Sequence, residues 1–342
     1  GKPTTEINIG SQRMVGLWLG RMQNFSQLKA SYKDIVATTQ PKNNRFNIGD
    51  ISILVNLEET KEGLWSGPSK ITLSDMSVDT PEEEDVLNLG EAVLLATITD
   101  IDPLKYKEAT KEIGNVEIYG NKPHHSLGLI NKILKASGDA VSVKGSLANL
   151  NMKTTATENK PAKEIKLEKI AFDYGIDGIQ NDNVNLTLGL NYRGDKKKEE
   201  QSDKALMPHT ADARINLTNF PMTKIIALGE KTLPQNDSNP DAQKVAALQA
   251  MMTLPQLLSE SGTTLAIKET KYGNDTYFVN LEGMLQANKN SLLGASGEML
   301  LKVTGLEKLR TALQAESTEE DTKEQRVIDQ ALKRLEFVEK IS

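Results

Sequence analysis

A regular alternation of apolar and polar residues is the feature that most constrains the fold of this chain. The clearest run extends from Val184 to Tyr192, where aliphatic residues at every second position alternate with asparagine, threonine and glycine. A second run of the same kind extends from Ala211 to Leu217. Successive side chains of a β-strand point to opposite faces, so each run predicts a strand with one apolar and one polar face. Such strands are typical of antiparallel sheets that keep one face in water.

Further runs of period two lie on both sides of these two. Clear runs cover 51–57 and 277–281, and weaker runs cover 68–78, 140–152, 263–271 and 297–304. Together they predict about ten strands, joined by polar segments that are rich in turn residues.

Two of the runs change phase partway along. Ile165 and Leu167 are followed by Ile170, so the apolar side slips by one residue near Glu168, and a similar slip occurs at Gly49–Asp50. A β-bulge produces such a slip, bends the strand and increases its twist. Two short strands joined by a turn are the alternative. With bulges, the sheet is long and strongly curved.

Amphipathic helices are expected between some of the strands. Asp102 as the N-cap and Pro103 at the first helical position predict a helix over 102–113. A second helix is expected over 125–136, with Ser126 as its cap and its end at Ser137–Gly138. Further helices are expected at 221–228, where Gly229 ends the helix, at 241–252, 254–258 and 306–313, and in the charged segment 322–340.

The predicted fold class is therefore α+β, mainly β. We expect a long curved antiparallel sheet, a meander with bulges, with several short amphipathic helices packed on it. The polar segment near 155–163 divides a β-rich N-terminal half, 1–155, from a β-rich C-terminal half, 164–315, and a charged C-terminal helix follows over 316–342. Because the alternation continues on both sides of that segment, one continuous sheet is an equal alternative.

Composition excludes several functional classes. The 41 Lys and Arg residues against 47 Asp and Glu give a net charge of −6, which disfavours a nucleic-acid-binding surface. The absence of cysteine excludes disulfides, thiolate catalysis and iron–sulfur clusters. The longest strongly apolar stretch, Met14–Leu19, is far shorter than the roughly 20 residues of a membrane-spanning helix.

No catalytic constellation is recognisable in the sequence. Glycine-rich loops that hold nucleotide phosphates are missing, and so is the nucleophile elbow of hydrolases. Ser26–Lys29 matches the S-x-x-K pattern, but the companion motifs are absent. His124 and His125 are adjacent and point in different directions, which disfavours one shared metal ion. We therefore expect no enzyme activity, no catalytic residues, no metal and no cofactor, although a hydrolase with dispersed carboxylates stays as a rival.

The apolar positions of the clearest strands form the candidate ligand-binding site. They are aliphatic and uncharged, which suits acyl chains because these need non-directional apolar contact. The candidate residues of an apolar groove are Leu186, Leu188, Leu190, Ile215, Leu217, Val279 and Leu281. The alternative is an ordinary packed core made of the same residues.

Several segments resemble one family of proteins. They are Ala213–Pro221, with its Leu-x-Asn-Phe-Pro ending, Leu265–Ile267 with Leu281–Gly283, and Ser296–Leu306 leading into Leu309 and Leu313; in the N-terminal half they are Asp50–Val55, Trp65–Gly67 and Lys70–Met76. In these segments the chain resembles uncharacterised alphaproteobacterial envelope proteins, similar in style to the AsmA-like and YdgA-like periplasmic proteins.

This resemblance implies a location and a class of function. It implies a periplasmic β-rich domain that an N-terminal helix anchors to the inner membrane. This helix would precede Lys2, and Gly1 is interpreted as a residue left by tag removal. The family has no catalytic residues to transfer. The expected function is non-catalytic binding or chaperoning of a lipid or another hydrophobic envelope component. The alternative is a structural or protein-interaction module of the envelope without a small-molecule ligand. Expected partners are such a ligand or an envelope protein, and no nucleic acid.

Overall fold

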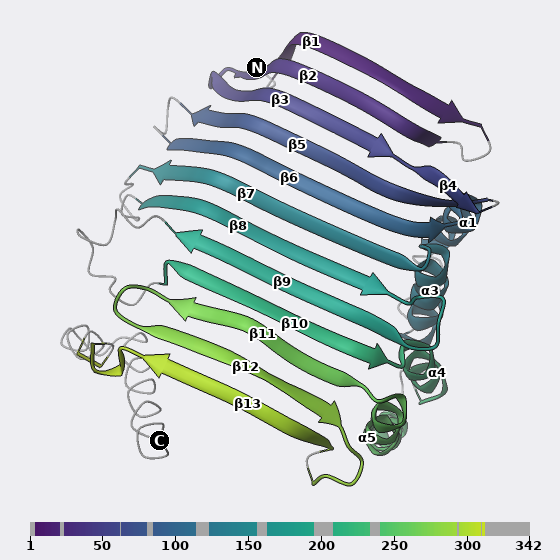
Figure 1. The fold of residues 1–342 in the computed structure, drawn as a ribbon. Coiled ribbons are helices and arrows are strands. Elements are labelled where there is room, and N and C mark those ends of the chain that lie inside the picture. The colour runs from purple at the N-terminus through teal and green to yellow at the C-terminus, as the bar shows by residue number, and fades with distance from the viewer. Residues whose placement is uncertain are drawn as a thin grey trace.

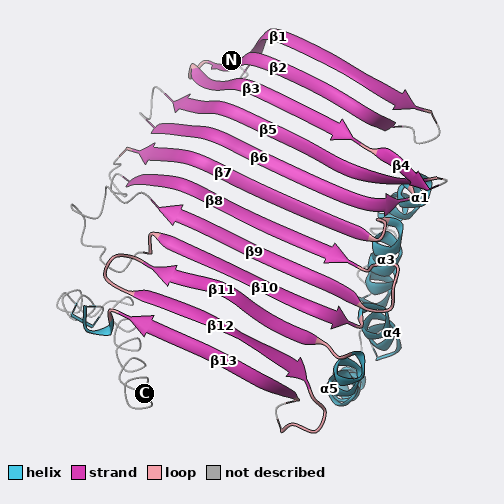
Figure 2. Ribbon diagram, viewed as in Figure 1, coloured by secondary structure: helices cyan, strands magenta, loops and turns pink. Residues whose placement is uncertain are grey.

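A long antiparallel sheet and a row of helices make up the part of the chain that the computed structural model describes. The described residues are 4–20, 24–61, 63–80, 85–113, 123–155, 163–194, 208–232, 240–292, 294–308 and 310–311. The sheet is open and has 13 strands, and the helices lie along one end of the strands (Figures 1 and 2). The predicted class, α+β and mainly β with a long antiparallel sheet, is confirmed.

The strands follow one another in the sheet in the order of the sequence. They are β1 (Thr4–Leu19), β2 (Asn24–Gln40), β3 (Asn44–Asn56), β4 (Glu58–Lys61), β5 (Leu64–Thr80), β6 (Asp85–Ile101), β7 (Ala140–Thr154), β8 (Lys163–Asp177), β9 (Val184–Gly194), β10 (Thr210–Phe220), β11 (Thr264–Gly273), β12 (Phe278–Ala287) and β13 (Ala295–Thr304). Each pairs with the next, except that β3 pairs with β5 and the short β4 pairs only with β5. The topology is a meander, as the sequence predicts.

The sheet continues without a break between the two halves of the chain. β7 and β8 lie on either side of the segment 155–163 and are paired from Ala140 with Asp177 to Thr154 with Lys163. The expected charged helix over 316–342 lies outside the described residues.

A row of unpaired residues crosses the first seven strands of the meander and explains the changes of phase. The ladder between β3 and β5 pairs residues on both sides of Gly49 and Asp75 but omits these two. Asp75 has a φ of 54°, and a Cβ on Gly49 would lie 3.0 Å from the Asp75 Cβ. The full row is Gly10, Asp34, Gly49, Asp75, Gly90, Asn149 and Glu168.

From Gly10 to Asn149, glycine alternates in this row with Asp or Asn for a steric reason. Asp34, Asp75 and Asn149 have positive φ values, a conformation that Asp and Asn tolerate better than other side chains. Their Cβ atoms occupy the space in front of the neighbouring strand, where only glycine fits without displacement. Each strand has one extra, unpaired residue at the row. The apolar residues after it are therefore shifted by one position in the sequence, and they stay on the same face of the sheet as those before it.

The predicted slips at Gly49–Asp50 and Glu168 are therefore confirmed as features of continuous strands. Gly49 lies inside β3, and the register between β8 and β9 shifts between Leu167 and Lys169. The alternative of two short strands joined by a turn is wrong at both places.

The helices form two of the connections between strands. α1 (Pro103–Ile113) and α3 (Pro123–Ala136) connect β6 to β7, and α4 (Met222–Thr232) and α5 (Pro240–Ser261) connect β10 to β11. Neighbouring helices contact one another in the order α1, α3, α4, α5 (Figure 1). They pack beside the ends of the strands rather than across a face of the sheet (Figure 2).

Two predicted helix boundaries are confirmed by capping contacts. The Asp102 carboxylate accepts hydrogen bonds from the backbone N–H groups of Leu104 (3.0 Å) and Lys105 (3.2 Å), as expected of an N-cap. α3 ends before Gly138, whose φ of 101° is in the left-handed region that favours glycine.

Other predicted boundaries are wrong. α4 continues past Gly229 to Thr232, and the two helices expected over 241–252 and 254–258 are one helix, α5. Pro255 lies inside α5, which continues past it to Ser261 although the proline lacks a backbone donor. Just before it, Thr253 Oγ1 donates to the Gln249 carbonyl (2.8 Å). α3 begins at Pro123, so His124 and His125 lie inside the helix rather than before it.

Three long strands were not expected from the sequence. They are β1, β2 and β6. In β6 the row residue Gly90 divides the apolar alternation into two short series, 87–89 and 92–98, which hides its period. In β2 the same happens at Asp34.

Two clusters of buried residues lie near the helix row, and other buried residues, such as Leu89 and Tyr277, lie away from it. One cluster contains Leu57 and Trp65, and Ile101 packs against it. A second cluster contains Ile176, Ile179 and Val184, and receives Leu134 from α3 and Met222 from α4. The helices thus cover one end of the strands. Away from that end most described side chains of the sheet are partly exposed, with Ile48 and Leu89 among the buried exceptions.

Candidate functional site: an open apolar sheet face

One face of the sheet carries an uninterrupted row of uncharged side chains from β1 to β13. Residues directly opposite each other in an antiparallel pair point to the same face, so the register traces the row across the sheet. The row runs Gln12, Tyr32, Ile51, Leu73, Ala92, Leu147, Ile170, Tyr192, Ala211, Tyr272, Val279, Val303. We call the side of the sheet that carries this row the apolar face.

Parallel rows extend the apolar face toward both ends of the strands. On the side of the unpaired residues, one row joins Ile9, Ile35, Ile48, Met76, Leu89, Leu150 and Leu167. On the side of the helices, another joins Val143, Tyr174, Leu188, Ile215 and Ile267. Burial raises the pKa of the Tyr174 phenol above its usual range.

The apolar face is open in its middle. Leu188 and Leu190 of β9 are 50% and 51% exposed, and Phe172 of β8 is 46% exposed. Similar exposures recur on β5, β6 and β7, at 40% for Ile71, 43% for Leu94 and 40% for Leu147. A side chain in a packed core is almost fully buried. Among the described residues, neither a helix nor a second sheet covers these positions (Figure 2).

All seven candidate residues of the sequence analysis lie on the apolar face. Leu186 lies opposite Leu217 and Leu188 opposite Ile215, across the ladder between β9 and β10. Val279 and Leu281 belong to β12. They lie opposite Tyr272 and Thr270 of β11, so they point to the same face as these two residues. The structure therefore gathers these residues on an open surface, whereas the sequence analysis expected a groove.

Most of the face was missed by sequence reasoning, because it extends far beyond β9, β10 and β12. The strands β1, β2 and β6 contribute to it, and so do β3, β5, β7 and β8. These strands can be recognised in the sequence if the apolar–polar alternation is counted separately before and after a Gly, Asp or Asn residue. The alternation changes phase there because that residue is unpaired.

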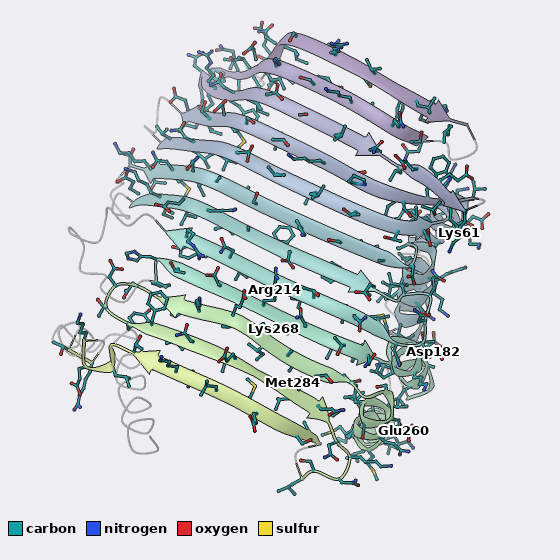
Figure 3. All side chains as sticks on the ribbon, viewed as in Figure 1. Lys61, Asp182, Arg214, Glu260, Lys268 and Met284 are labelled. Atoms are coloured by element: carbon teal, nitrogen blue, oxygen red, sulfur yellow. The ribbon has the colours of Figure 1, made fainter. Side chains whose placement is uncertain are left out.

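The opposite face is polar. Its corresponding row runs Arg13, Ser31, Ser52, Thr72, Val93, Ser146, Ala171, Asn191, Asp212, Lys271, Asn280, Lys302. Two ion pairs on it connect different strands. Arg193 contacts Asp212 at 2.8 Å, and Arg214, labelled in Figure 3, contacts Asp173 at 2.8 Å.

The Arg214–Asp173 pair spans the strand between its two partners. Asp173 is on β8 and Arg214 on β10, and the residue opposite both on β9 is Gly189. A Cβ on Gly189 would lie 2.8 Å from the Asp173 Cγ, so the missing side chain makes room for the carboxylate to cross β9. A hollow of about 440 Å³ lies here, lined by small residues such as Ser146 and by charged ones such as Lys144.

Ser26 of the S-x-x-K match is buried, and the side chains of His124 and His125 lie outside the described ones. Ser26 Oγ donates a 3.4 Å hydrogen bond to the Leu17 carbonyl. No group of three or more His, Asp or Glu side chains among the described residues is placed to hold a metal ion. No helix in the described ranges is long and apolar enough to cross a membrane.

Comparisons with protein-family models, with curated proteins and with solved structures found no match to this chain.

Proposed function

We propose that this protein binds or chaperones a lipid or another hydrophobic component on its apolar face, without catalysis. The observation that carries the proposal is the uncharged row from β1 to β13, flanked by aliphatic side chains that are 40–51% exposed on β5 to β9. Large contiguous apolar surfaces are uncommon on soluble monomers and mark sites where apolar partners bind.

The chemistry of the face favours acyl chains over polar ligands. Its residues are mainly Leu, Ile, Val and Ala, which offer contact without direction, and each methylene that leaves water contributes about 0.8 kcal/mol. The hydrogen-bonding groups and ion pairs gather on the polar face instead. A location in the bacterial envelope, with an anchor to the inner membrane, is part of this proposal and rests on the family resemblance.

The test is binding of a fluorescent fatty acid, together with extraction and mass spectrometry of lipid that copurifies with the protein. Leu188→Lys places a charge on the apolar face, whereas Thr187→Lys, one residue away on the same strand, places it on the polar face. We expect Leu188→Lys to weaken fatty-acid binding at least about tenfold, because binding would bury an unpaired charge. Thr187→Lys should change it less than about twofold.

A second strand provides an independent pair of variants. Ile215 and Asn216 are adjacent on β10 and lie opposite Leu188 and Thr187. Ile215→Lys should weaken binding as Leu188→Lys does, and Asn216→Lys should not. Equal losses in all four variants, or no binding to the unmodified protein, would count against the proposal. Circular dichroism melting of each variant separates loss of binding from loss of fold.

The second candidate function is a structural or protein-interaction module. The observation that favours it is that both edges of the described sheet, β1 and β13, have an unpaired side. This candidate is supported if the fatty acid does not bind and the edges engage a protein.

A further inference from the structure

The outer edge of β13 is a regular strand edge that has no partner strand among the described residues (Figure 1). Its ladder with β12 runs from Ala295 to Thr304 without a register shift. The other edge strand, β1, is interrupted at Gly10 and shifts register between Leu17 and Trp18. A long regular edge without proline or bulge is a template for pairing with another strand.

The sequence of β13 is complementary to itself when the strand is reversed. An antiparallel pairing centred on Leu300 places Glu298 opposite Lys302 of the second copy, and it does so twice because the arrangement is two-fold symmetric. On the apolar face, Met299 lies opposite Leu301 of the second copy, again twice. Toward both ends of the strand, the paired residues of the two copies also point to the same face of the sheet, because successive side chains alternate between the faces.

The side chains involved are exposed in the single chain. Leu300 is 58% exposed, Leu301 53% and Met299 42%. Glu298 and Lys302 lie on the polar face, about 13 Å apart along the strand, which is too far for an ion pair with each other. Opposite charges placed directly across an antiparallel pair stabilise it, and like charges destabilise it.

We propose that β13 pairs with β13 of a second copy of this chain, in an antiparallel two-fold arrangement centred on Leu300. The two-fold axis is perpendicular to the sheet, so the two sheets become one and both apolar faces lie on the same side. The interface is closed, since each copy uses the one regular edge that the described sheet offers. The inference is independent of what the apolar face binds.

The first test is a charge exchange followed by analytical ultracentrifugation of the full chain. Glu298→Lys and Lys302→Glu each replace two attractive pairs by two repulsive ones, so each should weaken the dimer about tenfold or more. The double variant Glu298→Lys/Lys302→Glu restores opposite charges and should restore the dimer. The control Glu6→Lys makes the same change of charge on β1 and should leave the dimer intact.

The second test is a disulfide across the two-fold axis. The chain has no cysteine, so Leu300→Cys can form a disulfide only with a second copy. Directly opposed residues have Cα atoms about 4.5–5.5 Å apart, within the range of a disulfide. The control Met284→Cys is 56% exposed on β12 and would lie at least about 14 Å from its symmetry mate. Oxidation should give a covalent dimer of Leu300→Cys alone.

Three results would overturn the proposal. A full chain that sediments as a monomer would mean that another occupant, such as residues 312–342 of the same chain, takes the edge. If Glu6→Lys disrupts the dimer and Glu298→Lys leaves it intact, the contact between the copies lies at β1. A double variant that stays as weak as the single ones would show that Glu298 does not face Lys302.

Discussion

Gly138 joins the helix row to the sheet, and it does so through its conformation. It follows the end of α3 with a φ of 101°, and a Cβ at this position would lie 2.2 Å from the Thr99 carbonyl oxygen of β6. The next residue, Asp139, donates its backbone N–H to that same oxygen at 2.8 Å. The close approach of the two backbones therefore requires glycine.

Replacement of Gly138 should be costly, in contrast to another glycine of the sheet. We predict that Gly138→Ala lowers the free energy of unfolding by about 2 kcal/mol or more, from backbone strain and the clash with Thr99. In Gly175→Ala the new Cβ meets only the Thr187 Cβ at 3.7 Å, so the change should stay within about 0.5 kcal/mol. Urea denaturation measures both, and equal losses would contradict the role given to Gly138.

Asp100 is a second residue whose surroundings make a measurable prediction. Its carboxylate accepts hydrogen bonds from Thr60 Oγ1 (2.6 Å) and Ser66 Oγ (3.3 Å), and Lys61 Nζ lies 3.5 Å away. The Thr60 hydroxyl, together with the Lys61 charge and the Ser66 hydroxyl, holds the pKa of Asp100 below its usual 3.8. These contacts tie β4 and β5 to β6.

Loss of the Thr60 hydroxyl should raise the pKa of Asp100. The folded state favours the ionised carboxylate, so its contribution to stability is complete above the unfolded pKa and is lost as the pH falls through the folded pKa, below about 4. NMR titration should show a higher pKa for Asp100 in Thr60→Ala than in the unmodified protein. Thr72→Ala, on β5 but away from Asp100, is the control; an unchanged pKa in Thr60→Ala would refute the assignment.

At the scale of the element, the same strand face is buried at the helix row and open in the middle. Ile176 of β8 is 3% exposed within the cluster that receives α3 and α4, whereas Ile215 of β10 is 37% exposed on the apolar face. The same truncation at the two positions therefore compares a packed side chain with an open one.

We predict that Ile176→Ala lowers the free energy of unfolding by about 2–5 kcal/mol, because it leaves a cavity that the neighbours cannot fill. Ile215→Ala should cost about 1 kcal/mol or less, since much of that side chain is already in water. Denaturant unfolding provides the measurement. A large loss at Ile215 would mean that the face is covered by a packed layer.

The elements that could be predicted from the sequence are those whose signal is local. Strand β9 and helix α1 carry an unbroken period or a capping pair, at Val184–Tyr192 and Asp102–Pro103, and both were predicted. β1, β2 and β6 were not predicted. Gly10, Asp34 and Gly90 shift their period partway along, as Gly49 and Glu168 do in β3 and β8, where the slip was recognised. The reason for that shift, the close approach of a glycine on one strand to the Cβ of Asp or Asn on the next, is not visible in one segment alone.

At the scale of the whole molecule, the apolar face follows from repetition of one local rule. Each strand contacts only its neighbours in the order β1 to β13, and each adds its apolar side to the same face. The seven candidate residues on β9, β10 and β12 were predicted to share a side, and the register places them together. That the face is open could not be predicted, because identical residues fill a packed core when a second layer covers them.

Under the proposed function, a hydrophobic ligand lies against the apolar face. Photo-crosslinking with a diazirine-bearing fatty acid, followed by mass spectrometry that locates the modified residues, tests it most directly. We expect adducts at apolar-face positions such as Leu188, Leu190 and Ile215, and few at the polar-face positions between them, such as Gly189 and Arg214. Adducts spread evenly over both faces, or adducts equally abundant on the unfolded chain, would contradict it.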